Sequence, residues 1–78
     1  MLGMRHKHVN IKGILARNMK KYRGKLKLTQ EQAAERADIG VNYWQRMEML
    51  SQSDLPSLPM LFKISKGLDV EAHQLLIE

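Results

Sequence analysis

Residues 29–50, TQEQAAERADIGVNYWQRMEML, predict two short helices that are separated by a brief interruption. Thr29 and Gln32 have the spacing of a capping box, in which the threonine oxygen accepts from a backbone N–H and the glutamine side chain reaches back. Glu31 falls in the first turn, where a negative charge suits the helix dipole. We therefore expect a helix over residues 30–37 that begins at this pair.

The interruption that follows has the residues of a tight turn. Asp38 tolerates the left-handed backbone that ends a helix, and Gly40 is an acceptable N-cap for a second helix over 41–50. Ala34 is small enough to let the two helices approach closely. The side chain of Ile39 is expected to pack from the turn into the core. The pattern therefore predicts two packed helices that are joined at this turn.

The helix over 41–50 has two chemically different faces. Trp44 and Met47 point to one side, and this position favours a place in the core over base stacking for the tryptophan. The major groove of DNA admits one helix and is read by hydrogen bonds, with Arg suited to guanine, Asn and Gln to adenine, and Val to the thymine methyl. The residues that we expect to read bases are Val41, Asn42, Gln45 and Arg46. Tyr43 lies between the faces, where it either donates to a phosphate or covers the core.

The rest of the chain predicts three further helices and no strand. The first covers residues 11 to about 25, the second begins after the N-cap Ser57 and ends near Gly67, and the third is a short helix over 70–77. The apolar positions are Leu15, Met19 and Tyr22 in the first, Leu58, Leu61, Phe62, Ile64 and Leu68 in the second, and Leu75, Leu76 and Ile77 in the third. The expected fold class is all-α, a compact domain of five helices.

Positive charge is concentrated near the start of the chain. The 78 residues have a net charge of +5, and nine of the 13 Lys and Arg residues lie between Arg5 and Lys27, ahead of the first acidic residue, Glu31. Residues 1–10 lack periodicity and are expected to form a flexible basic arm before one domain over 11–78. The arm either contacts phosphates weakly or takes no part in binding. Such a positive field suits a phosphate backbone or an anionic membrane surface.

Composition excludes or disfavours several other classes of protein. Without cysteine there is no disulfide, thiolate metal site or Cys nucleophile, and no apolar run approaches the roughly 20 residues that span a bilayer. No catalytic motif is present, so we expect a cytoplasmic protein that is not an enzyme and needs no cofactor or metal. His6 and His8, even with Met1 and Met4 nearby, supply too few ligands for a metal site.

Several residues in a shared spacing resemble the phage-repressor and Cro-type helix-turn-helix domains, the XRE-like family. The resemblance covers about residues 14–77 and depends on the whole set. The matching positions are Arg23 near the end of the first helix, Thr29-Gln30 at the start of the second, Ala34, Ile39, the Met47-Glu48 pair and Pro56-Ser57-Leu58 before the fourth helix. The resemblance implies a lambda-repressor-like fold and a transcriptional regulator, a repressor, that binds double-stranded DNA.

The resemblance also implies roles for individual residues. Gln30 contacts a phosphate or braces the recognition helix over 41–50, and Arg23 forms a partly buried ion pair with Glu48. The positions expected on the DNA backbone are Gln30, Arg23, Lys20, Lys21 and Tyr43. The base-reading positions are those already named.

A homodimer on a palindromic operator is expected for two reasons. One recognition helix reads too few base pairs for useful specificity, and related proteins pair half-sites about one helical turn apart. The C-terminal run LLIE also carries three large apolar side chains that one small domain does not readily bury. We expect the dimer contact at Leu75, Leu76 and Ile77, together with nearby parts of the fourth helix.

The sequence departs from the family pattern after the third helix. Where the family has Gly and basic residues that meet phosphates, this chain has Leu50-Ser51-Gln52-Ser53-Asp54. Either the first helix and the arm then supply the contacts with the DNA backbone, or DNA binding is weakened. Three alternatives stay open: a protein-interaction module of the same fold that has lost DNA binding, an antitoxin-like regulator with a partner protein, and a peripheral membrane binder.

Overall fold

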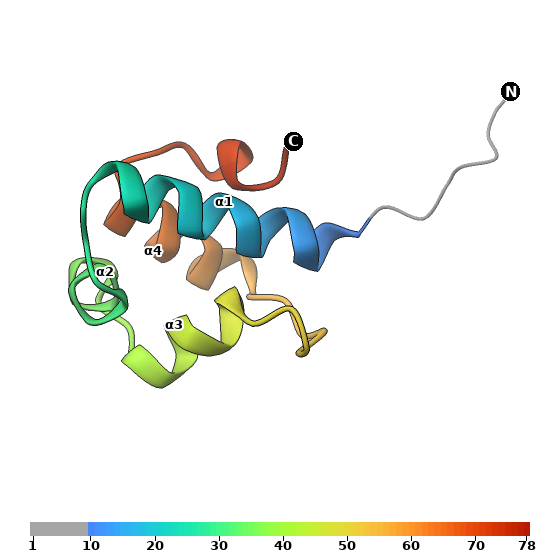
Figure 1. Cartoon of the computed structure of the whole chain (residues 1–78), viewed down its shortest axis with the longest axis horizontal. Coiled ribbons are helices and arrows are strands. Elements are labelled where there is room, and N and C mark those ends of the chain that lie inside the picture. Colours follow the sequence, from blue (N-terminus) through green and yellow to red (C-terminus); the bar gives the residue numbers. More distant parts are fainter. Residues whose placement is uncertain (1–9) are drawn as a thin grey trace, which may run out of the picture.

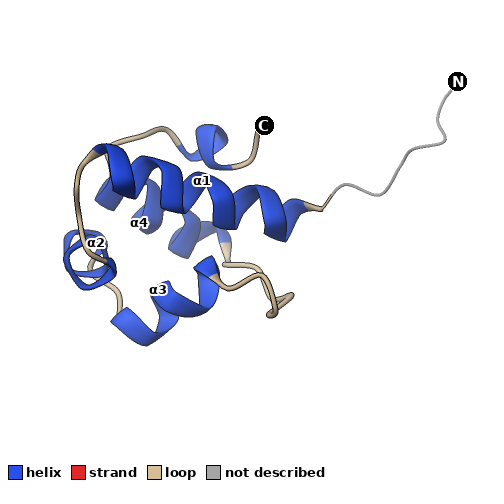
Figure 2. Ribbon diagram, in the orientation of Figure 1, coloured by secondary structure: helices blue, strands red, loops and turns tan. Residues whose placement is uncertain are grey.

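Four α-helices and one 3₁₀ helix make up the part of the chain that the computed structural model describes, residues 10–78 (Figure 1). In chain order the elements are α1 (Ile11–Lys25), α2 (Gln30–Ala37), α3 (Val41–Glu48), α4 (Leu58–Leu68) and the 3₁₀ helix Ala72–Leu75. Residues 10–78 contain no strand (Figure 2), so the all-α fold class is confirmed. The expected flexible arm lies outside the described residues except for Asn10.

Side-chain caps fix where the helices begin and end. The Asn10 side chain accepts from the backbone N–H of Gly13, so this residue belongs to α1 as its N-cap. The predicted capping box of Thr29 and Gln32 is present in both directions, at 3.0 and 2.9 Å. Asp38 has a φ of 60°, as its place at the end of α2 predicted. These local contacts explain why α2 has the bounds expected from sequence.

Two predicted helices differ from the structure. The expected fifth helix over 70–77 is a single 3₁₀ turn, so the count of five helices is wrong by one. Leu76 already has a non-helical backbone, and Asn18 Nδ2 holds this segment against α1 by donating to the carbonyl oxygens of Leu75 and Ile77 at 2.9 and 2.8 Å. The third helix also ends earlier than expected, at Glu48, because Met49 already has an extended backbone.

One hydrophobic core connects all the elements. Trp44 from α3 and Leu75 from the 3₁₀ helix are fully buried in it, beside Leu15 and Met19 of α1. At the crossing of α2 and α4, Gly67 lies so close to α2 that an added Cβ would sit 2.8 Å from the Cβ of Ala37. The end of α2, where the turn to α3 begins, is therefore closely packed against α4.

The apolar face of α4 is narrower than its sequence suggested. Leu61, Ile64 and Leu68 are buried, but Leu58 is 70% and Phe62 61% exposed. These two residues are four positions apart and therefore share one flank of the helix, which turns away from the core. No helix within residues 10–78 is both long and apolar enough to cross a membrane.

Candidate nucleic-acid interface

The helix α3 separates its apolar and polar side chains as the sequence predicted. Trp44 and Met47 are fully buried, whereas the side chains that point outward belong to Asn42, Gln45 and Arg46. Val41, which was grouped with them, is half-buried and packs against the core. The face that is free to meet a ligand thus carries two amides and one guanidinium.

Glu48 is the centre of a buried hydrogen-bond network at the end of α3. Its carboxylate accepts from Arg23 Nε at 2.8 Å and from Arg23 Nη2 at 3.0 Å, and only 1% of its side chain is exposed. It also accepts from Gln30 Nε2 at 2.9 Å and from Trp44 Nε1 at 2.6 Å. One carboxylate therefore links α1, α2 and α3 and fixes the angle at which α3 stands.

This network gives Gln30 and Arg23 bracing contacts within the domain. The Gln30 amide donates to Glu48, which is the bracing geometry. Arg23 has all three of its guanidinium nitrogens donating inside the chain, the third being Nη1 to the Leu28 carbonyl at 3.1 Å. The contact of Arg23 with the DNA backbone stays a prediction, and it would compete with these bonds.

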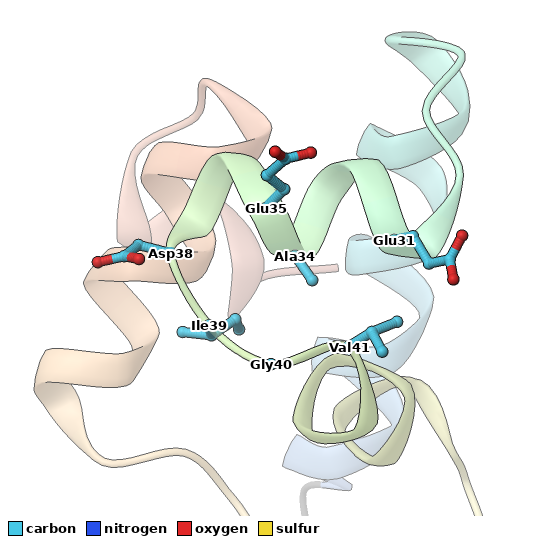
Figure 3. A pocket seen from close by; sticks show the side chains of 7 residues that line it. All are labelled: Glu31, Ala34, Glu35, Asp38, Ile39, Gly40 and Val41. Atoms are coloured by element: carbon cyan, nitrogen blue, oxygen red, sulfur yellow. The ribbon is translucent and has the colours of Figure 1, made fainter.

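The turn between α2 and α3 borders a shallow depression that carries negative charge (Figure 3). Ala34 forms its buried floor, and Ile39 packs against the core as the turn residue should. Figure 3 shows Glu31 and Asp38 at opposite ends of the depression. The negative charge of this corner opposes the approach of a phosphate group.

The two lysines expected at the DNA backbone lie on different sides of α1. Lys20 lines a groove together with Gln30, Gln45 and Ser51, next to the outward face of α3. Lys21 lies instead at a separate depression beside Arg17 and the C-terminal Glu78. Neighbouring residues on a helix point about 100° apart, which is consistent with their places in two different depressions. Only Lys20 is placed beside the candidate interface.

The profile of the helix-turn-helix family matches residues 19–75, which is most of the chain. The chain belongs to the XRE-type helix-turn-helix family. Among solved structures it is similar to the crystal structure of hypothetical transcription factor NHTF from Neisseria, with a TM-score of 0.79 and 26% identity over 87% of this chain and 74% of that one. No curated protein sequence matches the chain significantly. The family and this likeness support a DNA-binding regulator.

A buried lysine holds the loop that follows the recognition helix of this helix-turn-helix domain. Lys12 Nζ donates to the carbonyl oxygens of Arg46 at 3.1 Å and Gln52 at 2.7 Å, and lies 3.9 Å from Asp54 Oδ1. Asp54 Oδ2 in turn accepts from Arg46 Nε at 3.0 Å. Neither contact could be predicted from the sequence, because a lysine in a basic helix and an aspartate in a polar loop are ordinarily solvated.

Tyr43 stands beside this ion pair at the edge of the recognition helix. It is half-buried, and the guanidinium carbon of Arg46 lies 6.0 Å from the centre of its ring. Burial, with a smaller effect from the Asp54 carboxylate, raises the pKa of Tyr43, while Arg46 acts in the opposite direction. The neutral phenol is the form that can donate to a phosphate, so its ability to do so is kept at neutral pH.

The three residues expected at a dimer contact divide into two groups. Leu75 is fully buried in the core of its own domain, and including it in the interface is therefore wrong. Leu76 and Ile77 stay available, at 36% and 55% exposure. Residues 10–78 also contain no group of three His, Asp, Glu or Cys side chains arranged to hold a metal.

Proposed function

We propose that this domain binds duplex DNA sequence-specifically, with α3 in the major groove, and represses transcription. The observation that carries the proposal is the division of α3 into a buried face, with Trp44 and Met47, and an exposed polar face. Glu48 supports it further, because its network gives the recognition helix a fixed orientation. Repression follows from occupancy alone, since a bound protein excludes others from the same DNA.

The exposed polar face has the chemistry of base recognition. Arg46 is suited to guanine, where a guanidinium donates to O6 and N7, and Asn42 and Gln45 are suited to the edge of adenine. Val41 is half-buried at the start of α3, where it can touch a thymine methyl with the surface that is left. Lys20, in the groove beside Gln45, is the cation best placed for the nearest phosphate.

A homodimer would give this short reading face enough specificity. Two copies related by a twofold axis read a palindrome whose half-sites lie about one helical turn apart. We propose that Leu76 and Ile77 take part in the dimer contact, with the exposed Leu58 and Phe62 of α4 as the neighbouring candidates. Burial of such side chains against a second copy is favourable, because exposed apolar surface is removed from water.

The decisive experiment is a selection of bound sequences from random duplex DNA at about physiological salt. A recovered palindrome with half-sites about 10 bp apart supports the dimeric reader. Arg46→Ala should then cost about 1–3 kcal/mol at one base position and relax specificity there, whereas Lys20→Ala should weaken all sequences alike and make the salt dependence shallower. An equal loss on every sequence for Arg46→Ala contradicts its reading role.

The dimer contact has its own test by analytical ultracentrifugation. Ile77→Asp should give a folded monomer, because the side chain is largely exposed and its change leaves the core intact. Leu76→Asp should act in the same way, with circular dichroism as the check on folding. The matched control is Lys63→Asp, because Lys63 is also exposed but has a polar side chain. A dimer that persists in both apolar variants locates the interface elsewhere, with Phe62→Asp as the next variant.

A protein-interaction module of the same fold is the second candidate function. The negatively charged depression at Glu31, Glu35 and Asp38 and the loop that carries Asp54 favour it, because these charges oppose a DNA backbone. A folded protein that selects no DNA motif would support this candidate. Co-purification of a partner together with a DNA motif would instead indicate an antitoxin-like regulator.

A further inference from the structure

Asp54 lies between two cations at the end of the recognition helix. Its Oδ2 accepts from Arg46 Nε at 3.0 Å, and its Oδ1 lies 3.9 Å from Lys12 Nζ. The side chain of Asp54 is 41% exposed and that of Arg46 is 53% exposed, so the pair lies at the protein surface. In the proposed function this surface faces the DNA. An acidic side chain at such a position weakens the attraction of the surface for phosphates.

The loop that carries Asp54 is fastened to the rest of the domain from inside. Lys12, whose side chain is only 8% exposed, binds the carbonyl oxygens of Arg46 and Gln52. The first of these belongs to the last turn of α3 and the second to the loop, so one ammonium group joins them. The position of the Asp54 carboxylate relative to α3 is therefore set by a buried contact as well as by its own bond to Arg46.

The guanidinium of Arg46 is restrained on two sides but keeps donors for a ligand. Asp54 occupies Nε, and the Tyr43 ring centre lies 6.0 Å from the guanidinium carbon. Neither terminal nitrogen of Arg46 donates a hydrogen bond to another residue within 10–78. Two terminal nitrogens are what a bidentate contact to guanine O6 and N7 uses.

We propose that Asp54 is a specificity-determining residue that positions Arg46 for one guanine, an inference that depends on the proposed DNA-reading function. An ordered Arg46 loses less side-chain freedom when it meets its base, so the cognate contact strengthens relative to others. The carboxylate meanwhile repels the phosphates of every sequence. Asp54 thus lowers affinity for DNA in general and raises discrimination at a single base pair.

The test is Asp54→Asn, which keeps the shape of the side chain and removes its charge. Binding is measured on the selected operator and on operators changed at each base pair in turn. We expect binding to unrelated DNA to strengthen about twofold, from the removal of one repulsive charge roughly 8 Å from a phosphate. Discrimination at the base pair read by Arg46 should fall about fivefold, the scale of ordering one long side chain.

Two controls separate positioning from net charge. Asp69→Asn makes the same chemical change at another exposed position, and its left-handed backbone, with a φ of 60°, accepts asparagine. This variant should leave discrimination at every base pair unchanged. In an Arg46→Ala background, Asp54→Asn should no longer change discrimination, because the residue that it positions is gone.

Discrimination that is unchanged or improved in Asp54→Asn overturns the inference, the second result meaning that Asp54 competes with DNA for Arg46. Wild-type protein without preference at any base pair would contradict the proposed function, and the inference would fall with it.

A readout without DNA is the nitrogen relaxation of the Arg46 Nε–H group. We expect this group to be ordered in the wild type and more mobile in Asp54→Asn, because a neutral amide oxygen accepts from Nε more weakly than a carboxylate does. Equal mobility in the two proteins overturns the positioning role.

Discussion

Replacement of Glu48 by glutamine tests whether the network at the end of α3 stabilises the domain. The carboxylate accepts four hydrogen bonds, two from Arg23 and one each from Gln30 and Trp44. An amide has only one oxygen, so its NH₂ group must face donors on one side. The Gln30 amide can turn over and offer its oxygen, but whichever side the NH₂ takes, one Arg23 donor loses its acceptor and the other keeps only a neutral one.

The size of the effect follows from burial. A hydrogen bond to a charged group is worth about 1.5–3 kcal/mol, and an unpaired buried donor costs about 1–3 kcal/mol. Glu48 is almost fully buried, but the Arg23 side chain is 22% exposed, so water can take up part of the loss. We therefore expect Glu48→Gln to lower the free energy of unfolding by about 3 kcal/mol. For a domain of this size that corresponds to a fall in Tm of roughly 12–24 °C.

The assay is urea unfolding followed by circular dichroism and by the fluorescence of Trp44, the one tryptophan of the chain. Glu35→Gln is the matched control, because Glu35 is exposed on α2 and should change stability by less than about 0.5 kcal/mol. In an Arg23→Met background, Glu48→Gln should cost at least about 1 kcal/mol less than in the wild type, because the charged partner is absent. A loss below about 1 kcal/mol in the single variant would refute the reasoning, since that is the value of an exposed ion pair.

Three further predictions follow from the packing and charges of the domain. Lys12→Met should lower the free energy of unfolding by about 1–3 kcal/mol in urea, because the Gln52 carbonyl oxygen loses its donor and the Arg46 carbonyl oxygen keeps only the Met49 N–H. Gly67→Ala should destabilise by about 1–3 kcal/mol, because the new Cβ would lie 2.8 Å from a methyl group of α2. Gly24→Ala, which meets no atom within 4 Å, should stabilise by about 0.5–1 kcal/mol in the same assay, and equal effects of the two alanines would contradict the packing argument. Because burial and Asp54 raise the pKa of Tyr43 above 10.0, the unfolded chain deprotonates first, and stability should fall as the pH rises through this range. Tyr43→Phe should reduce this loss of stability at alkaline pH. Asp54→Asn should lower the pKa of Tyr43 in a tyrosinate absorbance titration. An unchanged titration would contradict the proximity of Asp54 and Tyr43.

The parts of the fold that were predicted correctly depend on neighbours in the chain. Thr29 and Gln32 cap α2 through contacts within three residues, and Asp38 closes the same helix through its own backbone preference. The alternation of buried and exposed residues in α3 is likewise a property of a single helix. Local signals of this kind are readable in a sequence, because the partner of each group lies within one turn.

The parts that were missed depend on distant partners. Lys12 meets carbonyl oxygens 34 and 40 positions away, and Asn18 meets two that are 57 and 59 positions away. Periodicity assigns a residue to a face but does not give the depth to which that face is covered. For the same reason Leu58 and Phe62 could not be separated from the buried positions of α4.

The buried lysine accounts for the departure of this chain from the family pattern after the recognition helix. The loop over 49–55 has no basic residue of its own, yet a cation from α1 lies behind it. An ammonium at the C-terminal end of α3 is favoured by the helix dipole, and it gives the Arg46 carbonyl a second donor beside the Met49 N–H. The charge thus supports α3 from within and is not available to phosphates, so the proposed contact with the DNA backbone falls to residues such as Lys20 on the open side of α1. On the proposed function, the cations of α1 therefore divide by the direction of their side chains: Lys12 supports α3 from inside the domain, and Lys20 is placed to meet a phosphate.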